Sequence, residues 1–213
     1  MNKNDVLRHL GHNNQEIDQS LDKMIDHYIK SVENLNGKYV YKIFDFEKDD
    51  DINVLNTILN LKGDSIKHIL SQASQLILFA GTLGHEMDQK ILKSSYDSSL
   101  DMMILDACAS VRIEDILDQM EKEIKKIHPV YLTPRFSPGY GDLSLGIQRD
   151  LIEVIGAKKI GIHVTDSSVL LPKKSVTGII GISDNKMTVT YRFCDDCLLR
   201  TSCDFKRCKR EGQ

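Results

Sequence analysis

Apolar side chains recur every three or four positions over much of the chain, which is the spacing of one face of an α-helix. Helices are predicted before Gly11, over residues 15–34, 64–70, 99–126 and 144–155, and from about His85. Asp64 is expected to cap the helix that it begins. In the longest helix the expected buried stripe comprises Leu100, Met103, Ala107, Val111, Leu117, Met120, Ile124 and Ile127.

Short runs of β-branched and aromatic residues, bounded by turn residues, predict strands. They cover residues 39–44, 75–80, 160–165, 176–183 and 187–193, the last two joined by a turn at Asp184-Asn185. The acidic run 45–51 is interpreted as a solvated loop, and the turn at 81–84 as an ordinary strand-to-helix connection. Because the last strands follow one another without helices between them, we expect an antiparallel sheet and the α+β class.

Composition narrows the class of protein. The chain has 213 residues, 41% of them hydrophobic and 28% charged, which suits one globular domain whose core needs no disulfides. Its formal net charge of −3 argues against a nucleic-acid partner. No apolar run reaches about 18 residues, and the N-terminus carries no apolar signal segment. We therefore expect a cytoplasmic protein that does not associate with a membrane.

Four of the five cysteines crowd together at the end of the sequence. Cys194, Cys197, Cys203 and Cys208 are spaced so that their thiolates can surround one metal ion or cluster. The compact spacing favours an iron–sulfur cluster over zinc, and disulfides or unpaired thiols are the remaining alternatives. Residues 194–213 are therefore predicted to form a Cys-rich metal-binding tail after a single domain over residues 1–193. Cys108, alone in the long helix, is interpreted as a packing residue.

The segment from Arg135 to Tyr140 carries the most distinctive chemistry. Arg135 offers a planar guanidinium suited to a carboxylate, and Tyr140 offers a phenol. Between them, Ser137, Pro138 and Gly139 combine a fixed φ angle with backbone that a ligand can approach closely. The segment suits a small zwitterionic or heterocyclic ligand, and the alternative is a rigid turn with a surface arginine.

Two strings in the sequence carry a resemblance to a known family. Arg-x-Ser-Pro-Gly-Tyr at 135–140 and Leu-Pro-Lys-Lys-Ser-Val-Thr-Gly at 171–178 resemble the S-adenosylmethionine-binding activation domain of cobalamin-dependent methionine synthase. There the strings read Arg-x-x-Pro-Gly-Tyr and Pro-x-x-Ser-Val-Ser/Thr-Gly. Leu-Asp-Ala at 105–107 and Thr-Leu-Gly-x-Glu at 82–86 resemble free-standing, split forms of that domain. The resemblance spans residues 5–193.

The resemblance implies a C-shaped α+β domain whose twisted antiparallel sheet, flanked by helices, binds S-adenosylmethionine (AdoMet) in a shallow groove. By the match, Arg135 holds the ligand's carboxylate, the backbone of Ser137 pairs with the adenine edge, and Tyr140 lies beside the sulfonium. Pro138 and Gly139 complete the predicted binding segment, and residues 175–178 support it as a neighbouring strand.

The resemblance also implies partners. In the family, the domain presents AdoMet to a cobalamin while an electron donor reduces the oxidised cobalt. The modules that bind homocysteine, methyltetrahydrofolate and cobalamin do not fit in 213 residues. We therefore expect action in trans on a cobalamin-dependent methionine synthase or another corrinoid protein, with a flavodoxin- or ferredoxin-type donor and no turnover by this chain alone.

Two other functions fit parts of the sequence. One is a small metal-binding module whose Cys tail recognises another protein or a nucleic acid. The other is a self-sufficient methyltransferase, against which the lack of a glycine-rich Rossmann motif counts. The seven histidines are scattered, without an HExxH pair.

Overall fold

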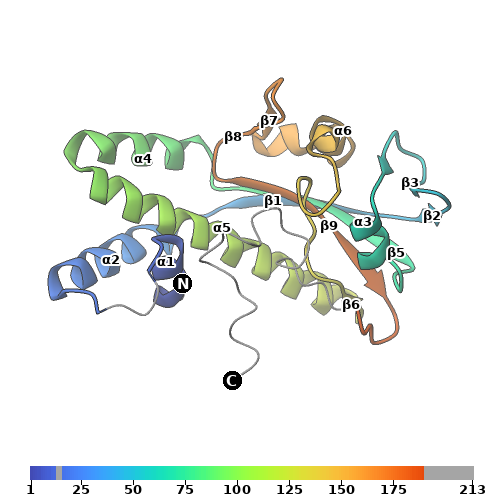
Figure 1. The fold of residues 1–213 in the computed structure, drawn as a ribbon, viewed down its shortest axis with the longest axis horizontal. Coiled ribbons are helices and arrows are strands. Elements are labelled where there is room, and N and C mark those ends of the chain that lie inside the picture. The colour runs from blue at the N-terminus through green and yellow to red at the C-terminus, as the bar shows by residue number, and fades with distance from the viewer. Residues whose placement is uncertain (13–15, 190–213) are drawn as a thin grey trace.

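A four-stranded antiparallel sheet forms the centre of the chain in the computed structural model, which describes residues 1–12 and 16–189 (Figure 1). The strands lie in the order β1-β5-β9-β6, and every neighbouring pair is antiparallel. They are β1 (Lys38–Phe44), β5 (Gln75–Thr82), β6 (Tyr131–Leu132) and β9 (Ser175–Ser183). Helices flank this sheet, so the predicted α+β class is confirmed.

Side chains of β5 alternate between two apolar clusters, because successive residues of a strand point to opposite faces of the sheet. Leu76 and Leu78 pack with residues of α3 (Asp64–Ile69) and α6 (Gln148–Ile155). Ile77 and Phe79 pack against the second half of α5 (Ser99–Ile127). All four side chains are fully buried. The sheet is therefore a middle layer, with α5 along one side and α6 on the other (Figure 1).

The first half of α5 lies at the centre of a helical cluster. Its partners are α1 (Lys3–His9), α2 (Gln19–Val32) and α4 (His85–Asp97). Val6, Ile25 and Cys108 are fully buried in this cluster. Burial raises the pKa of the Cys108 thiol to about 12, so the thiol stays protonated and packs as a small apolar group, as predicted.

Short elements complete the fold and correct one loop prediction and one strand prediction. They are β2 (Phe46–Lys48), β3 (Ile52–Val54), β4 (Asn60–Leu61), β7 (His163–Val164), β8 (Leu170–Leu171) and the 3-10 helices η1 (Leu145–Ile147) and η2 (Ala157–Ile160). The acidic run 45–51, which was predicted to be a loop, contains β2. This strand pairs with β3, whose residues Ile52 and Val54 are buried. The predicted strand 160–165 is reduced to two residues, since η2 ends at Ile160 and Gly161 turns the chain with φ +85°.

The predicted last strand, 187–193, is wrong for the part that the structure describes. Residues 187–189 are not in a strand. The backbone N–H of Thr188 donates to the side chain of Gln72 at 2.9 Å, and the two neighbours of β9 in the sheet are β5 and β6. Residues 190–193 lie outside the described residues.

The buried face of α5 is wider than the predicted stripe. Leu100, Met103 and Ile127 are 45%, 52% and 63% exposed, whereas Ile104 and Ile113, outside the stripe, are buried. A single stripe fails because the helix packs against other helices in its first half and against the sheet in its second. Although α5 has 29 residues, no helix in the described part of the chain is long and apolar enough to cross a membrane.

The start of α3 is capped from a distance. Its N-cap residue is Gly63, and no side chain of that position contributes a cap, so the predicted cap by Asp64 is wrong. The carboxylate of Asp142 instead accepts hydrogen bonds from the backbone N–H groups of Asp64 at 2.6 Å and Ser65 at 3.1 Å. Gly63 adopts φ +124°, and a Cβ there would lie 2.5 Å from Asp142 Oδ1. Asp142 therefore ties the turn that follows Tyr140 to α3.

We expect Asp142→Asn to lower the free energy of unfolding at neutral pH by about 1 kcal/mol, the usual contribution of a helix cap. Burial opposes ionisation of this carboxyl, but the backbone N–H groups of Asp64 and Ser65 outweigh it and lower the pKa of Asp142. The stabilisation is therefore present above the unfolded-state pKa of about 4 and is lost as the pH falls through the lower folded-state pKa. Urea unfolding at pH 7 and pH 3 measures both effects.

Asp50→Asn is the matched control, because Asp50 is an exposed loop carboxylate. A stability difference between wild type and Asp142→Asn that is equal at the two pH values would contradict the capping role of the ionised carboxylate.

Candidate functional site

The segment 135–140 lies beside β9, the strand that contains residues 175–178, as the resemblance predicted. The N–H of Phe136 donates to the carbonyl of Ile179 at 2.9 Å, and the N–H of Ile179 donates to the carbonyl of Phe136 at 2.8 Å. Gly178 makes this approach possible: a Cβ on Gly178 would lie 2.6 Å from the Phe79 ring and 3.0 Å from the Phe136 carbonyl oxygen. The small residue in the 175–178 string therefore brings the segment against the sheet.

The second half of the segment is a tight turn that requires glycine. The N–H of Tyr140 donates to the Ser137 carbonyl at 3.0 Å, and Gly139 has φ +90°, a backbone conformation that side chains disfavour. Pro138, within the turn, is buried. Tyr140 is 48% exposed, and its ring meets that of Phe136 edge-on at 6.0 Å. The turn therefore holds a fixed backbone and one accessible aromatic ring.

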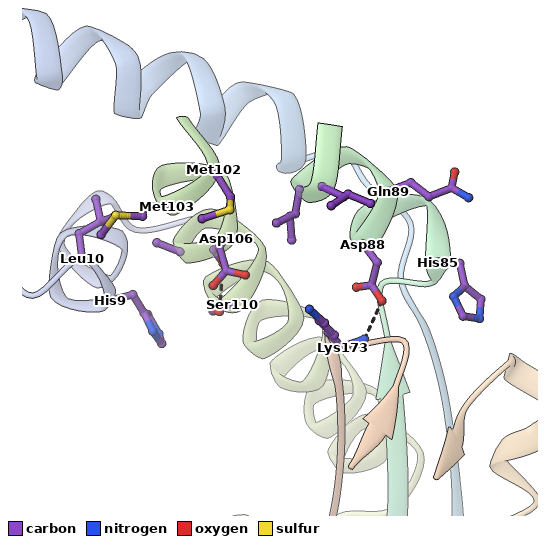
Figure 2. Close-up of a pocket in the computed structure, with 13 residues that line it drawn as sticks. His9, Leu10, His85, Asp88, Gln89, Met102, Met103, Asp106, Ser110 and Lys173 are labelled. Carbon is purple, nitrogen blue, oxygen red and sulfur yellow. Dashed lines mark hydrogen bonds between the residues drawn. The ribbon is translucent and has the colours of Figure 1, made fainter. Parts of the chain in front are cut away.

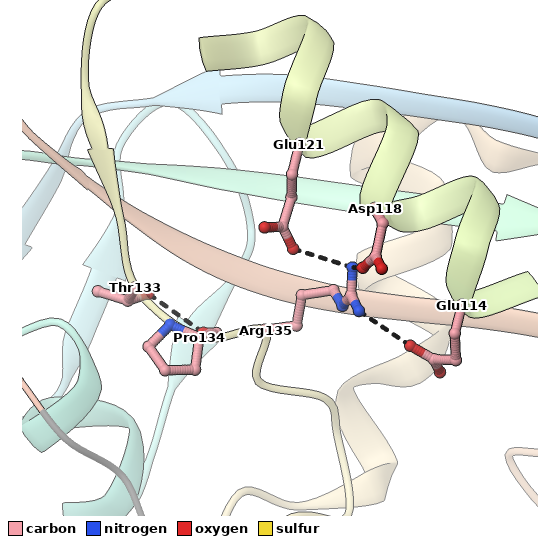
Figure 3. Close-up of polar contacts among 6 residues, drawn as sticks. All are labelled: Glu114, Asp118, Glu121, Thr133, Pro134 and Arg135. Atoms are coloured by element: carbon pink, nitrogen blue, oxygen red, sulfur yellow. Dashed lines mark hydrogen bonds and ion pairs between the residues drawn. The ribbon is translucent and has the colours of Figure 1, made fainter. Parts of the chain in front are cut away.

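Arg135 points toward α5 and contacts three carboxylates (Figure 3). Its Nη1 lies 2.8 Å from Asp118 Oδ1 and 2.9 Å from Glu121 Oε1, and its Nη2 lies 3.0 Å from Glu114 Oε2. The Arg135 side chain is 22% exposed, whereas those of Glu114 and Asp118 are about half exposed, at 49% and 54%. The guanidinium is thus partly buried between the loop and the helix, with two of its three partners accessible to solvent.

The carboxylates and Arg135 shift each other's ionisation. Burial on its own lowers the pKa of Arg135, but Glu114, Glu121 and Asp118 outweigh it, so the pKa is raised. Burial raises the pKa of the Glu121 carboxyl, and the attraction of Arg135 offsets this only in part. The guanidinium therefore stays charged, and the Glu121 carboxyl protonates more readily than an ordinary glutamate.

Arg135 and its three carboxylates have N–H donors and negative charge beyond those used in their ion pairs. A guanidinium has five N–H donors, three of which meet the carboxylates, and five minus three leaves two outside these ion pairs. Three carboxylates face one guanidinium, so the group carries a net charge of −2 when all are ionised. A ligand with one carboxylate and two cationic centres complements this arrangement.

The sequence analysis missed the three acidic residues. Glu114, Asp118 and Glu121 are spaced i, i+4 and i+7, so they lie on one face of α5. The signal is a row of acidic residues on the polar side of a long helix, in a chain with an arginine in a loop that contains proline and glycine. Only the fold shows that the row and Arg135 meet.

The remaining predicted site residues fall into two groups. Arg135, Ser137, Pro138, Gly139 and Tyr140 lie in the one continuous segment described above, and their contact with a ligand stays a prediction. Cys194, Cys197, Cys203 and Cys208 lie outside the described residues. Within residues 1–12 and 16–189, no group of three or more His, Cys, Asp or Glu is arranged to hold a metal ion.

The turn at 81–84 has the contacts of an ordinary connection. The N–H of Leu83 donates to the carbonyl of Lys174 at 2.9 Å, and the N–H of Gly84 donates to Thr82 Oγ1 at 3.0 Å. These backbone donors are occupied by protein acceptors, so they form no ready cradle for an anion.

Comparisons with known proteins identify the fold. No protein-family model matches the sequence, and no curated protein sequence matches it. Among solved structures, the chain is similar to one described as the MetH reactivation domain bound to AdoHcy, with a TM-score of 0.62 and 18% identity over 84% of this chain and 70% of that chain. At this identity the likeness shows the fold alone, and it is the fold that the two sequence strings predicted.

Proposed function

We propose that this chain binds AdoMet at the 135–140 segment and presents it to the corrinoid of a separate cobalamin-dependent methyltransferase, such as methionine synthase. The observation that carries the proposal is the placement of Arg135. It lies between a rigid glycine-containing turn and the acidic face of α5, within a fold shared with a domain bound to AdoHcy.

The charges of AdoMet match this group. AdoMet carries a carboxylate, an ammonium and a sulfonium. In the proposal, the carboxylate binds the two remaining donors of Arg135 as a charge-assisted contact, and the ammonium binds the half-exposed carboxylates of Glu114 and Asp118. The adenine edge meets the backbone of Ser137. The exposed ring of Tyr140 faces the sulfonium, since an aromatic face attracts a cation.

The chemistry assigned to this chain is positioning. Bound at this site, AdoMet would supply its methyl group, without the bonding electrons, to the reduced corrinoid of the partner. The electron pair of the broken S–C bond stays on sulfur, so the neutral thioether AdoHcy is released. The one electron that reduces the partner's corrinoid beforehand comes from a flavodoxin- or ferredoxin-type donor. No residue of this chain gains or loses an electron or a proton in the transfer.

Calorimetric titration of the purified protein tests the proposal. We expect saturable binding of AdoMet and of AdoHcy. We also expect the protein, with AdoMet and reduced flavodoxin, to restore activity to an oxidised methionine synthase that lacks its own activation domain. Binding without restored activity would contradict the reactivation role, and no binding of either nucleotide, with or without the corrinoid enzyme, would overturn the whole proposal in favour of an interaction module.

The tail is proposed to hold a metal, on the cysteine spacing alone. Protein purified without oxygen is expected to be brown and to contain iron and sulfide, with the visible absorption of thiolate-ligated iron. Replacing Cys194 and Cys197 by serine should remove the colour, whereas Cys108→Ser should retain it, because Cys108 is buried in the helical cluster. A colourless protein with one zinc per chain would contradict an iron–sulfur cluster in the tail.

A further inference from the structure

A cavity of about 670 Å³ lies between α4 and α5, away from Arg135 (Figure 2). Its α5 residues fall between Met102 and Ser110, whereas the partners of Arg135 begin at Glu114. Its volume is in the range of pockets that hold small organic ligands. The cavity is therefore separate from the proposed AdoMet site.

The wall of the cavity is largely apolar. Ile91 and Leu92 come from α4, and Met102, Met103 and Ala107 come from α5. Leu92 and Met103 are 58% and 52% exposed, so part of this wall lies open at the mouth. Methionine side chains adapt their shape and make favourable contacts with aromatic rings. The wall suits an aliphatic or aromatic skeleton.

The cavity also contains a buried carboxylate oxygen. Asp88 Oδ2 accepts a hydrogen bond from the backbone N–H of Lys173 at 2.8 Å. Asp88 Oδ1 is buried and has no hydrogen-bond partner among the described residues. A charged oxygen removed from water without a partner is unfavourable, so this atom is suited to a cationic donor.

Asp88 differs from the other acidic and basic side chains near the cavity, which are paired with protein groups or exposed to solvent. Asp106 is paired with Lys174 at 2.9 Å, and Lys174 also donates to Ser110 Oγ at 2.8 Å. The side chain of Lys173 lines the cavity but is exposed. His9 and His85 lie on opposite sides of the cavity (Figure 2).

We propose that this cavity binds a small organic cation, an ammonium group on an aryl or alkyl skeleton, whose charge pairs with Asp88. The apolar skeleton lies against Met102 and Met103, and the ammonium donates to Asp88 Oδ1. The proposal does not depend on the AdoMet site.

Titration of methionine-methyl NMR signals tests the proposal with three probes of one shape. They are phenethylammonium, neutral 2-phenylethanol and anionic 3-phenylpropanoate, each added to the full chain at pH 7. We expect saturable shifts of the Met102 and Met103 methyl signals with phenethylammonium and at least tenfold weaker binding of the other two. Equal binding of the alcohol would overturn the proposal, and this comparison requires no variant to fold.

Substitutions of the charged residues near the cavity test which of them pairs with the ligand's ammonium. Asp88→Asn should weaken phenethylammonium binding at least tenfold, and Lys173→Met should leave it unchanged or tighter. Glu86→Gln is the matched control, because Glu86 is an exposed carboxylate in the same turn of α4, and it should change the affinity less than twofold. Unchanged binding by folded Asp88→Asn would contradict the proposal.

Competition with AdoMet separates this proposal from the previous one. We expect AdoMet not to displace phenethylammonium. Displacement, together with weaker AdoMet binding by Asp88→Asn, would make the cavity part of the AdoMet site and overturn the inference of a second site. Failure of AdoMet to bind at all, with phenethylammonium still bound, would overturn only the proposed function.

Discussion

Arg135→Ala is expected to weaken AdoMet binding by about 1.5–3 kcal/mol, the range for hydrogen bonds to a charged group, which is roughly a 10- to 150-fold rise in Kd. The substitution removes the donors for the ligand's carboxylate. It also leaves Glu114, Asp118 and Glu121 facing one another without a cation. We therefore expect a loss of stability of about 1–3 kcal/mol as well, since these carboxylates are left unpaired. Calorimetric titration and urea unfolding measure the two effects.

Two further variants separate the loss of ligand contact from the loss of stability. Arg149→Ala removes an exposed arginine that pairs with Asp166 at 2.9 Å, and it should change neither quantity by more than about 0.5 kcal/mol. Arg135→Lys keeps the charge but loses the planar fork, so it should restore much of the stability and little of the affinity. Unchanged affinity in a folded Arg135→Ala protein would remove Arg135 from the site.

Gly178→Ala is expected to destabilise the protein by about 1–3 kcal/mol, the usual cost of overpacking a core. The new methyl group would meet the fully buried ring of Phe79 and the backbone of Phe136, and neither can move freely. Because Phe136 directly follows Arg135, the displacement should also weaken AdoMet binding at temperatures where the variant is folded. The midpoint temperature of thermal unfolding is expected to fall by about 2–4 °C for each kcal/mol of stability lost.

Gly81→Ala is the matched control on the neighbouring strand. A Cβ on Gly81 would lie 2.9 Å from Leu117 Cδ2, the end of a side chain that can change its rotamer. We expect a smaller loss of stability and no change in AdoMet affinity. Equal effects of the two substitutions on affinity would mean that the contact between Gly178 and Phe136 does not position the segment.

Local patterns predicted the parts of the fold that local forces determine. The helices α1, α2 and α5 follow from apolar spacing, α4 follows from the glycine-containing turn before it, and β5 and β9 follow from short apolar runs between turn residues. The position of 135–140 beside the strand that contains the 175–178 string was predicted from the resemblance, and the pairing itself joins Phe136 to Ile179. Where burial depends on the neighbours, prediction failed: Leu100 and Met103 are exposed because α5 changes partners along its length.

The features that the sequence did not show are contacts between distant segments. Asp142 caps a helix that begins 78 residues earlier, so no local motif marks it. Glu114, Asp118 and Glu121 form ion pairs only because the loop after β6 places Arg135 beside them. Such contacts depend on the packed fold, and the sequence offers only the charge and spacing of the partners.

Helix α5 connects the two ends of the molecule as a stiff rod. One side of it carries Asp106 and Ser110, which bind Lys174, and farther along the acidic partners of Arg135. Asp106 and Asp118 lie about 18 Å apart along the axis at 1.5 Å per residue. A rigid helix turns as a unit, so a repacking of α1 or α2 that rotates its first half would swing the carboxylates around Arg135 by a similar angle. Under the proposed function, substitutions in the N-terminal helices are therefore expected to change AdoMet affinity without contacting the nucleotide.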